Sequence, residues 1–179
     1  RVIKNILNEE EIKTLFKATK TIREKAIILT LAYSGLRVSE LSNLTPRDIN
    51  FENRQITVRQ GKGSKDRIVN ITDACAKTLR KYISDKQSAM DDIIFSKQPI
   101  IRRTLKRITK RTDITKRVHP HSLRHSLATN LLLKGCDLVT IQKQLGHSDV
   151  KTTTVYLQLT DELQKQKYNE YAPQYAEVV

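Results

Sequence analysis

Three histidines and an arginine stand close together in the stretch HPHSLRHS, residues 119–126. Histidines at such spacing can hold a metal ion, cap a helix or bind an anion. Pro120 is typical of a first helical turn, so His121 and Arg124 share one face near a helix start. Unpaired backbone N–H groups there attract anions, and a guanidinium matches phosphate oxygens. The stretch therefore favours a phosphate-binding site.

A zinc site is the weaker interpretation of the same residues. His119 and His121 flank a proline, and no cysteine or carboxylate stands nearby as a fourth ligand. We therefore predict that this stretch binds no metal. We expect His119 to be a helix cap or a neutral substitution, and His125 to be a buried hydrogen-bonding residue that braces the helix.

Two further short motifs carry residues able to act on a phosphate. GLRVSEL places Arg37 after a turn at Gly35, with Glu40 one helical turn later to hold it. LGHSD places His147 in a turn between helices, and Tyr156 follows in TTTVY. Each motif alone is a weak signal, because a single histidine or arginine is more often packed or solvated than catalytic.

The elements that must position these residues are mostly helical. AIILTLAY at 26–33 is apolar nearly all round, which is typical of a buried central helix. DINF, RQITVRQ and RIVNI predict three short strands, with GKGSKD at 61–66 as the turn of a hairpin. Other helices are expected after an Asn8 cap, from Thr72, and at 100–117, 120–134, 137–145, 148–158 and 160–173. We predict an α+β fold, mostly helical, with a small three-stranded antiparallel sheet.

The charge of the chain indicates an anionic partner. Its 179 residues, enough for one domain, carry 33 Lys and Arg against 19 Asp and Glu, a net charge of +14. Such an excess is typical of proteins that bind nucleic acid or an anionic membrane. The longest apolar run is far too short to span a bilayer, and no secretory leader is present. We expect a cytoplasmic protein with no membrane partner, in which Cys75 and Cys136 are unpaired, buried thiols.

The most basic segment is 100–117, with eight basic residues and one acid. Ile101, Leu105 and Ile108 give it an apolar stripe. A solvated surface is the ordinary interpretation of a charged run, but without acids the cations cannot pair at i,i+4. We therefore predict a helix that faces phosphates. The cations outside the stripe are Arg102, Arg103, Lys106, Arg107, Lys110 and Arg111.

Together, these motifs resemble the tyrosine recombinases of the phage integrase family, most of all the Xer-like members. The resemblance covers nearly the whole chain. It rests on Arg37 in GLRVSEL, Lys62 in GKGSKDR, His121 and Arg124 in HSLRH, His147 in LGHSD, and Tyr156. It implies that 1–179 is a single catalytic domain of the DNA breaking-rejoining fold, and that the family's N-terminal core-binding domain is absent from this chain.

The resemblance also implies site-specific DNA recombination, with strand cleavage and rejoining through a 3′-phosphotyrosine and without metal or cofactor. Tyr156 would be the nucleophile. Arg37 and Arg124 would clamp the phosphate oxygens, where the transition state spreads its charge. Tyr33 and Tyr82 fall on apolar helical faces, so we expect both in the core instead.

Proton transfer is assigned by the same resemblance. His121 would accept the tyrosine proton, His147 would add a hydrogen bond, and Lys62 would protonate the leaving 5′-oxygen. Lys65, a second lysine on the same turn, is expected to contact DNA instead. By family position, Arg102, Arg103 and Lys106 should also contact DNA, near its major groove.

The implied partner is double-stranded DNA, bound by a tetramer on two duplexes that assembles from monomers. Three alternatives use some of the same residues. A type IB topoisomerase shares the chemistry, and a non-catalytic DNA-binding module would need only the basic surface. A rolling-circle nuclease pairs histidines on a strand with a metal, whereas HPHSLRH leads into a helix. That class also has no need of Arg37 or Lys62.

Overall fold

The computed structural model describes residues 6–59, 66–146 and 154–173. Its three strands form one antiparallel sheet in the order β1-β2-β3. The predicted α+β fold and three-stranded sheet are confirmed. The elements are α1 (Glu9–Lys17), α2 (Ile22–Ser34), α3 (Val38–Ser42), the 3-10 turn η2 (Pro46–Asp48), β1 (Ile49–Asn50), β2 (Gln55–Val58), β3 (Arg67–Asn70), α4 (Asp73–Lys86), α5 (Gln98–Thr109), α6 (Pro120–Leu133), α7 (Leu138–Leu145) and α8 (Thr154–Tyr171).

Helix starts follow the side chains that cap them. The Asn8 side chain accepts from the Glu11 backbone N–H at 2.9 Å, and the Glu11 carboxylate accepts from the Asn8 N–H at 2.8 Å, a complete capping box. Thr72 caps α4 through its side-chain oxygen, which accepts from the Cys75 backbone N–H at 3.3 Å. Because these caps satisfy N–H groups that have no intrahelical partner, the two predicted starts are confirmed.

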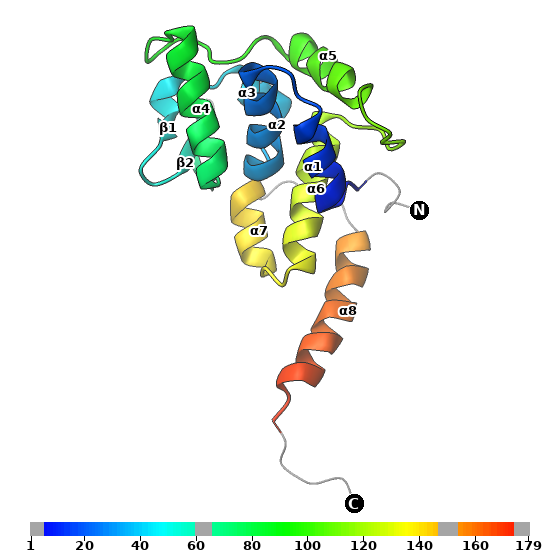
Figure 1. The fold of residues 1–179 in the computed structure, drawn as a ribbon. Coiled ribbons are helices and arrows are strands. Elements are labelled where there is room, and N and C mark those ends of the chain that lie inside the picture. The colour runs from blue at the N-terminus through cyan, green and yellow to red at the C-terminus, as the bar shows by residue number, and fades with distance from the viewer. Residues whose placement is uncertain (1–5, 60–65, 147–153, 174–179) are drawn as a thin grey trace, which may run out of the picture.

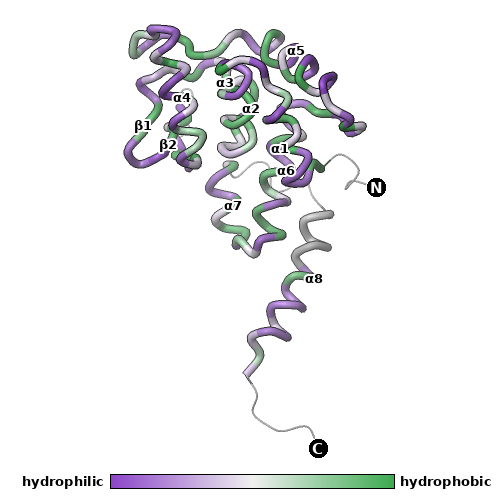
Figure 2. Tube along the Cα trace, in the orientation of Figure 1, coloured by the Kyte–Doolittle hydropathy of each residue, from purple (hydrophilic) through white to green (hydrophobic). Residues whose placement is uncertain are grey.

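Helix α2 is the centre of the core, as its apolar sequence predicts. It contacts α1, α4, α5 and α6, and every residue from 26 to 32 is buried. Figure 2 shows it as mostly hydrophobic beyond its first turn, with the other helices around it (Figure 1). Tyr82 is buried as predicted, but the prediction for Tyr33 is wrong, since that residue is 40% exposed. A tyrosine has a polar tip that favours solvent, so its place in an apolar run does not ensure burial.

Helix α5 is tied to α2 through a buried acid, Glu24. Arg111 donates to its two carboxylate oxygens at 2.7 and 3.2 Å, and Arg107 donates at 2.9 Å. Burial alone would raise the pKa of Glu24, but the hydrogen bonds from Arg111, the Lys20 backbone and Arg107 lower the pKa to about 2. The premise that these cations lack an acidic partner is therefore wrong for Arg107 and Arg111. Their partner, Glu24, lies more than 80 residues earlier in the chain and not at a neighbouring position of the same helix.

Helix α8 leaves the body of the protein and extends away from it (Figure 1). The predicted break near residue 159 is wrong, because α8 is one continuous helix and no glycine or proline interrupts it. Leu163 packs against the apolar cluster of α6 and α7, whereas Tyr168 and Tyr171 are 70% and 74% exposed. No described helix, α8 included, has both the length and the apolar character that crossing a bilayer requires.

The two cysteines are unpaired, as predicted. Cys75 is buried under α2, where burial raises the pKa of its thiol to about 12, while Cys136 is only half-buried. A thiol with so high a pKa holds its proton at neutral pH, so Cys75 serves as a small core residue.

Candidate active site

A glycine turn at the end of α2 positions the first predicted catalytic arginine. Gly35 ends the helix with φ 66° and ψ 24°, the left-handed conformation that favours glycine. A Cβ at this position would lie 2.5 Å from Cδ2 of Leu145, so a larger residue would also force the Leu145 side chain to move. Arg37 follows two residues later as the N-cap of α3.

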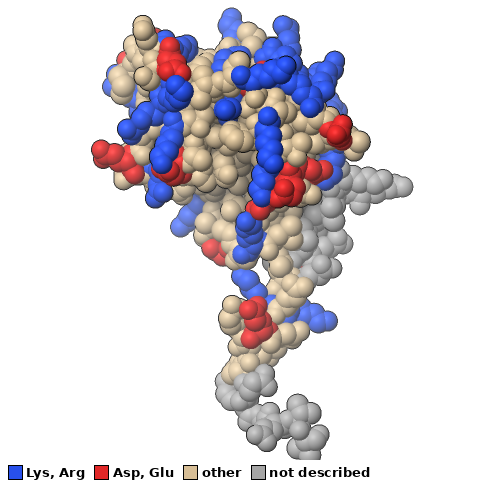
Figure 3. All heavy atoms as spheres, viewed as in Figure 1, with Lys and Arg blue, Asp and Glu red and all other residues tan. Residues whose placement is uncertain are grey.

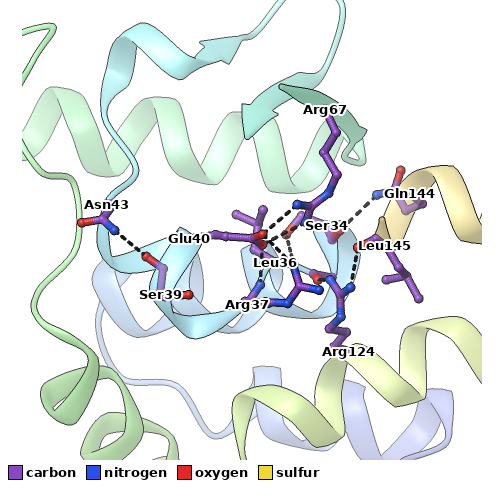
Figure 4. A network of polar contacts seen from close by, with 11 residues as sticks. Ser34, Leu36, Arg37, Ser39, Glu40, Asn43, Arg67, Arg124, Gln144 and Leu145 are labelled. Carbon is purple, nitrogen blue, oxygen red and sulfur yellow. Dashed lines mark hydrogen bonds and ion pairs between the residues drawn. The ribbon is translucent and has the colours of Figure 1, made fainter. Parts of the chain in front are cut away.

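Arg124 joins the same turn from α6. Its side chain is buried, and its two terminal nitrogens donate to the carbonyl oxygens of Gly35 and Leu145 (Figure 4). Both acceptors lie at helix C-terminal ends, where exposed carbonyls carry partial negative charge. Because the two carbonyls belong to α2 and α7, they fix the plane of the guanidinium. The structure thus brings Arg37 and Arg124, distant in sequence, to one turn.

A carboxylate lies between Arg37 and a third arginine. Glu40 accepts from the Arg37 backbone N–H at 2.7 Å and from its guanidinium at 3.2 Å, so the predicted contact is confirmed. Arg67, from β3, donates to both carboxylate oxygens at 2.7 and 2.9 Å. Burial alone would raise the pKa of Glu40, but the bonds from Arg67 and the Arg37 backbone lower it. Sequence reasoning missed Arg67, although its alternation with buried Val69 places it on the inner face of β3.

The three histidines at the start of α6 make different contacts. His119 is the N-cap, as predicted, and its Nδ1 accepts from the Ser122 N–H at 3.1 Å. Burial, followed by the nearby charges of Arg117 and His121, lowers the pKa of His119. His121 is exposed, and its Nε2 lies 2.6 Å from Nε2 of the half-buried His125. His125 therefore holds His121 directly, and the described residues contain no group of three or more potential ligands placed to bind a metal.

A basic groove of about 830 Å³ lies between α5 and the start of α6. Arg102, Lys106 and Lys110 line it because four-residue spacing puts them in one row of α5. Figure 3 shows Lys and Arg side chains gathered over α5 with few acids among them. Arg103 is exposed but does not line the groove, since it is turned about 100° from Arg102. The remaining lining residues are Thr109, Thr112, Ile114, Lys116, Arg117, Val118, His119 and His121.

Gln144 fixes the end of α7 to the sheet and to α2. Its side-chain amide donates to the carbonyl oxygens of Asn70 at 2.8 Å, Ser34 at 3.2 Å and Tyr33 at 3.3 Å. Its oxygen accepts from the Asn70 N–H at 2.9 Å, and Figure 4 shows the side chain reaching toward Ser34. These bonds hold in place the residue next to Leu145, whose carbonyl orients Arg124.

Three predicted site residues, Lys62, Lys65 and His147, lie outside the described residues. The described chain resumes just after the two lysines, at the base of the β2–β3 hairpin, and ends just before His147 at Gly146. Tyr156 lies in the first turn of α8. The roles assigned to these four residues stay predictions.

Known proteins resemble this chain over most of its length. The family model described as "Phage integrase family" matches residues 5–162. Tyrosine recombinase XerA of Saccharolobus solfataricus is 42% identical over 166 residues, which cover 92% of this chain and 55% of that protein. A tyrosine recombinase of Thermosipho africanus is 39% identical over 169 residues, with 90% and 60% covered.

The crystal structure of a XerA recombinase superposes with a TM-score of 0.79 at 37% identity, and covers 95% of this chain and 66% of that one. The chain spans little more than half the length of the two curated relatives named above. The fold, the paired arginines at Gly35 and the matched length lead to one assignment: this chain belongs to the phage integrase family, as a tyrosine recombinase catalytic domain of the Xer-like kind.

Proposed function

We propose that the protein is a site-specific DNA recombinase that cuts and rejoins strands through a 3′-phosphotyrosine at Tyr156. The observation that carries the proposal is the meeting of Arg37 and Arg124 at one turn, near the start of the helix whose His121 lines the basic groove. Phosphodiester cleavage requires positive charge fixed around the scissile phosphate. A DNA-binding module alone would not require a buried guanidinium held at two helix ends.

The charge of the transition state falls on the two non-bridging oxygens of the phosphate. Arg124 is oriented by two carbonyls before substrate binds, so its guanidinium needs little reorganisation during the reaction. Arg37 would bind the same oxygens from the other side of the Gly35 turn. Two fixed guanidinium groups would supply the charge that a metal ion supplies in other nucleases, so we propose cleavage without metal or other cofactor.

Proton transfers complete the proposed step. The Tyr156 hydroxyl would attack phosphorus as His121 takes its proton, and the bond to the 5′-oxygen would break as Lys62 protonates that oxygen. His147 would donate a hydrogen bond to the phosphate. The phosphotyrosine ester keeps the energy of the broken bond, so a second 5′-hydroxyl can reverse the step.

Double-stranded DNA is the proposed substrate, with its backbone in the basic groove and with Lys65 and Arg103 as further contacts. We propose that the protein is a monomer in free solution and forms a tetramer on two duplexes, in the cytoplasm. The exposed Tyr168 and Tyr171 on the extended α8 support this assembly, since they leave apolar surface for a neighbouring protomer.

A suicide substrate tests the proposed function. A duplex nicked beside the cleavage point loses its short 5′-hydroxyl fragment, which traps the covalent intermediate. A protein–DNA adduct should appear on a denaturing gel, equally in magnesium and in excess chelator. Failure to form an adduct with cognate DNA would refute the proposal, and strict dependence on added metal would favour a rolling-circle nuclease.

Lys62→Ala should lose cleavage of ordinary DNA but recover on DNA with a bridging 5′-phosphorothiolate. The sulfur leaves as a thiolate and needs no proton, so loss of the general acid should not slow cleavage of this substrate. We expect a loss of about 10²- to 10⁴-fold on the ordinary substrate. Arg37→Ala is the control, because loss of a phosphate contact should persist on both substrates. Equal failure of both variants would show that Lys62 only binds phosphate.

Arg102→Ala and Lys106→Ala should each weaken DNA binding. Each should also make the negative slope of log K against log salt shallower by about one. Each change removes a cation from the groove, and with it one displaced counterion. Binding isotherms at several salt concentrations measure the slope. Lys81→Ala on α4, a cation paired with Asp85, is the charge-matched control and should leave the slope unchanged. A wild-type slope in both groove variants would contradict the groove as the DNA site, and Arg103→Ala tests whether contact extends beyond it.

A further inference from the structure

The base of the β2–β3 hairpin carries an arginine turned toward the interior. Side chains alternate along β3, so Arg67 shares a face with the fully buried Val69, while Ile68 faces the other way. The Arg67 side chain is only 10% exposed, whereas Ile68 is 57% exposed. An apolar residue outside and a guanidinium inside reverse the usual order of a strand. The position of Arg67 therefore calls for a reason other than core packing.

Arg67 forms a forked ion pair with Glu40, the carboxylate that also holds Arg37 (Figure 4). Its side chain packs at the other end of the site as well, since a Cβ on Gly146 would lie 3.5 Å from the Arg67 Cδ and Nε. Nε itself is buried and has no hydrogen-bond partner among the described residues. A buried donor without a partner lowers stability, so this arrangement is better explained by function than by folding.

The charges of the three residues explain what Arg67 does. Glu40 carries one negative charge, and Arg37 and Arg67 each carry one positive charge, so the trio keeps a net charge of +1. Without Arg67, the negative charge of Glu40 would cancel that of Arg37. The carboxylate would then hold the Arg37 guanidinium alone, in competition with a phosphate. The side chains of Glu40 and Arg67 are only 14% and 10% exposed, whereas that of Arg37 is 37% exposed, so water screens this competition only in part.

We propose that Arg67 is a positioning residue that offsets the charge of Glu40 and so leaves Arg37 available to the scissile phosphate. The inference rests on the proposed function, because it takes Arg37 as a phosphate ligand. Arg67 also begins the strand that follows the turn containing Lys62. The ion pair therefore fixes the first residue of β3, five positions after Lys62 in the chain, beside Arg37.

Single-turnover cleavage of the nicked suicide substrate tests the proposal. Arg67→Met should cleave about 10²-fold more slowly, the loss expected when one charged group no longer stabilises a transition state. The double variant Arg67→Met with Glu40→Gln should recover roughly tenfold over Arg67→Met, because a neutral amide no longer cancels the charge of Arg37. A structural role predicts the opposite, since two changes to one network would destabilise the site further.

Two controls test whether the slower cleavage by Arg67→Met is specific to Arg67 and whether it concerns the phosphate or the leaving group. Arg59 directly follows β2 and forms an ion pair of 2.6 Å with Asp48 of η2, so Arg59→Met breaks a different ion pair near the same strands and should leave the rate unchanged. On the 5′-phosphorothiolate substrate, Arg67→Met should stay slow while Lys62→Ala recovers, which assigns Arg67 to the phosphate rather than to the leaving group. Recovery of Arg67→Met on that substrate would overturn the assignment.

Thermal unfolding of each variant separates misfolding from loss of charge. If Arg67→Met does not fold, Arg67→Lys replaces it, since lysine keeps the charge and should cleave within about tenfold of wild type. A folded Arg67→Lys slower than that, a double variant no faster than Arg67→Met, or a wild-type rate in Arg67→Met would each overturn the proposal. Failure of the proposed function is distinct, because the wild-type protein would then form no adduct.

Discussion

Tyr156→Phe should abolish the covalent protein–DNA adduct and leave DNA affinity unchanged. The substitution removes only the hydroxyl oxygen that is proposed to attack phosphorus, at a position in the first turn of α8. The cleavage rate should fall by more than about 10⁴-fold, as expected when a nucleophile is lost. The adduct on a denaturing gel and a parallel binding isotherm measure the two quantities.

Tyr33→Phe is the matched control for this substitution. Tyr33 is 40% exposed at the end of α2 and lies four residues before Arg37, so it is the tyrosine chosen to test for a substitute nucleophile. The control should form the adduct at the wild-type rate. Peptide mapping of the wild-type adduct to Tyr33 or to the buried Tyr82, or an adduct that survives Tyr156→Phe, would contradict the assignment.

Arg124→Ala should impair both cleavage and the stability of the fold. It removes a guanidinium that two carbonyls hold in place and that, under the proposed function, would bind the phosphate, which should slow cleavage by about 10³-fold. It also leaves the carbonyls of Gly35 and Leu145 without their donor, and each unpaired buried group destabilises the fold by about 1–3 kcal/mol. Single-turnover cleavage and thermal unfolding measure the two effects separately.

Arg124→Lys separates geometry from charge. Lysine keeps the positive charge, but one ammonium group cannot bridge carbonyls on two helices in the plane that the guanidinium occupies. We expect it to cleave nearly as slowly as the alanine variant. A wild-type rate would show that a point charge is sufficient and that the two carbonyl bonds serve stability alone.

Local patterns predicted the elements and the residues at their ends. Alternation in RQITVRQ and RIVNI located β2 and β3, and the side chains of Asn8 and Thr72 located helix starts, because these signals depend on neighbours in the chain. Spacing also paired Glu40 with Arg37, one helical turn apart. All of these contacts are short-range, so the sequence contains them directly.

Long-range partners could not be predicted in the same way. The acid that pairs Arg107 and Arg111 is Glu24, more than 80 residues earlier in the chain, and no periodic pattern relates these positions. Arg67 and Glu40 are likewise brought together only when β3 packs on α3. The family resemblance named the proposed catalytic residues, but the contacts of those that the structure describes depend on the packing of whole elements.

The carboxylate that ties α5 to α2 also makes this attachment sensitive to protons. The folded state lowers the pKa of Glu24 from 4.5 to about 2 against the effect of burial, so folding favours its ionised form. By linkage this gives at most about 3 kcal/mol of stability, present above pH 4.5 and lost as the pH falls toward 2. Protonation would leave Arg107 and Arg111 beside a neutral acid. The orientation of the basic helix is therefore fully secured at neutral pH and weakened by acid.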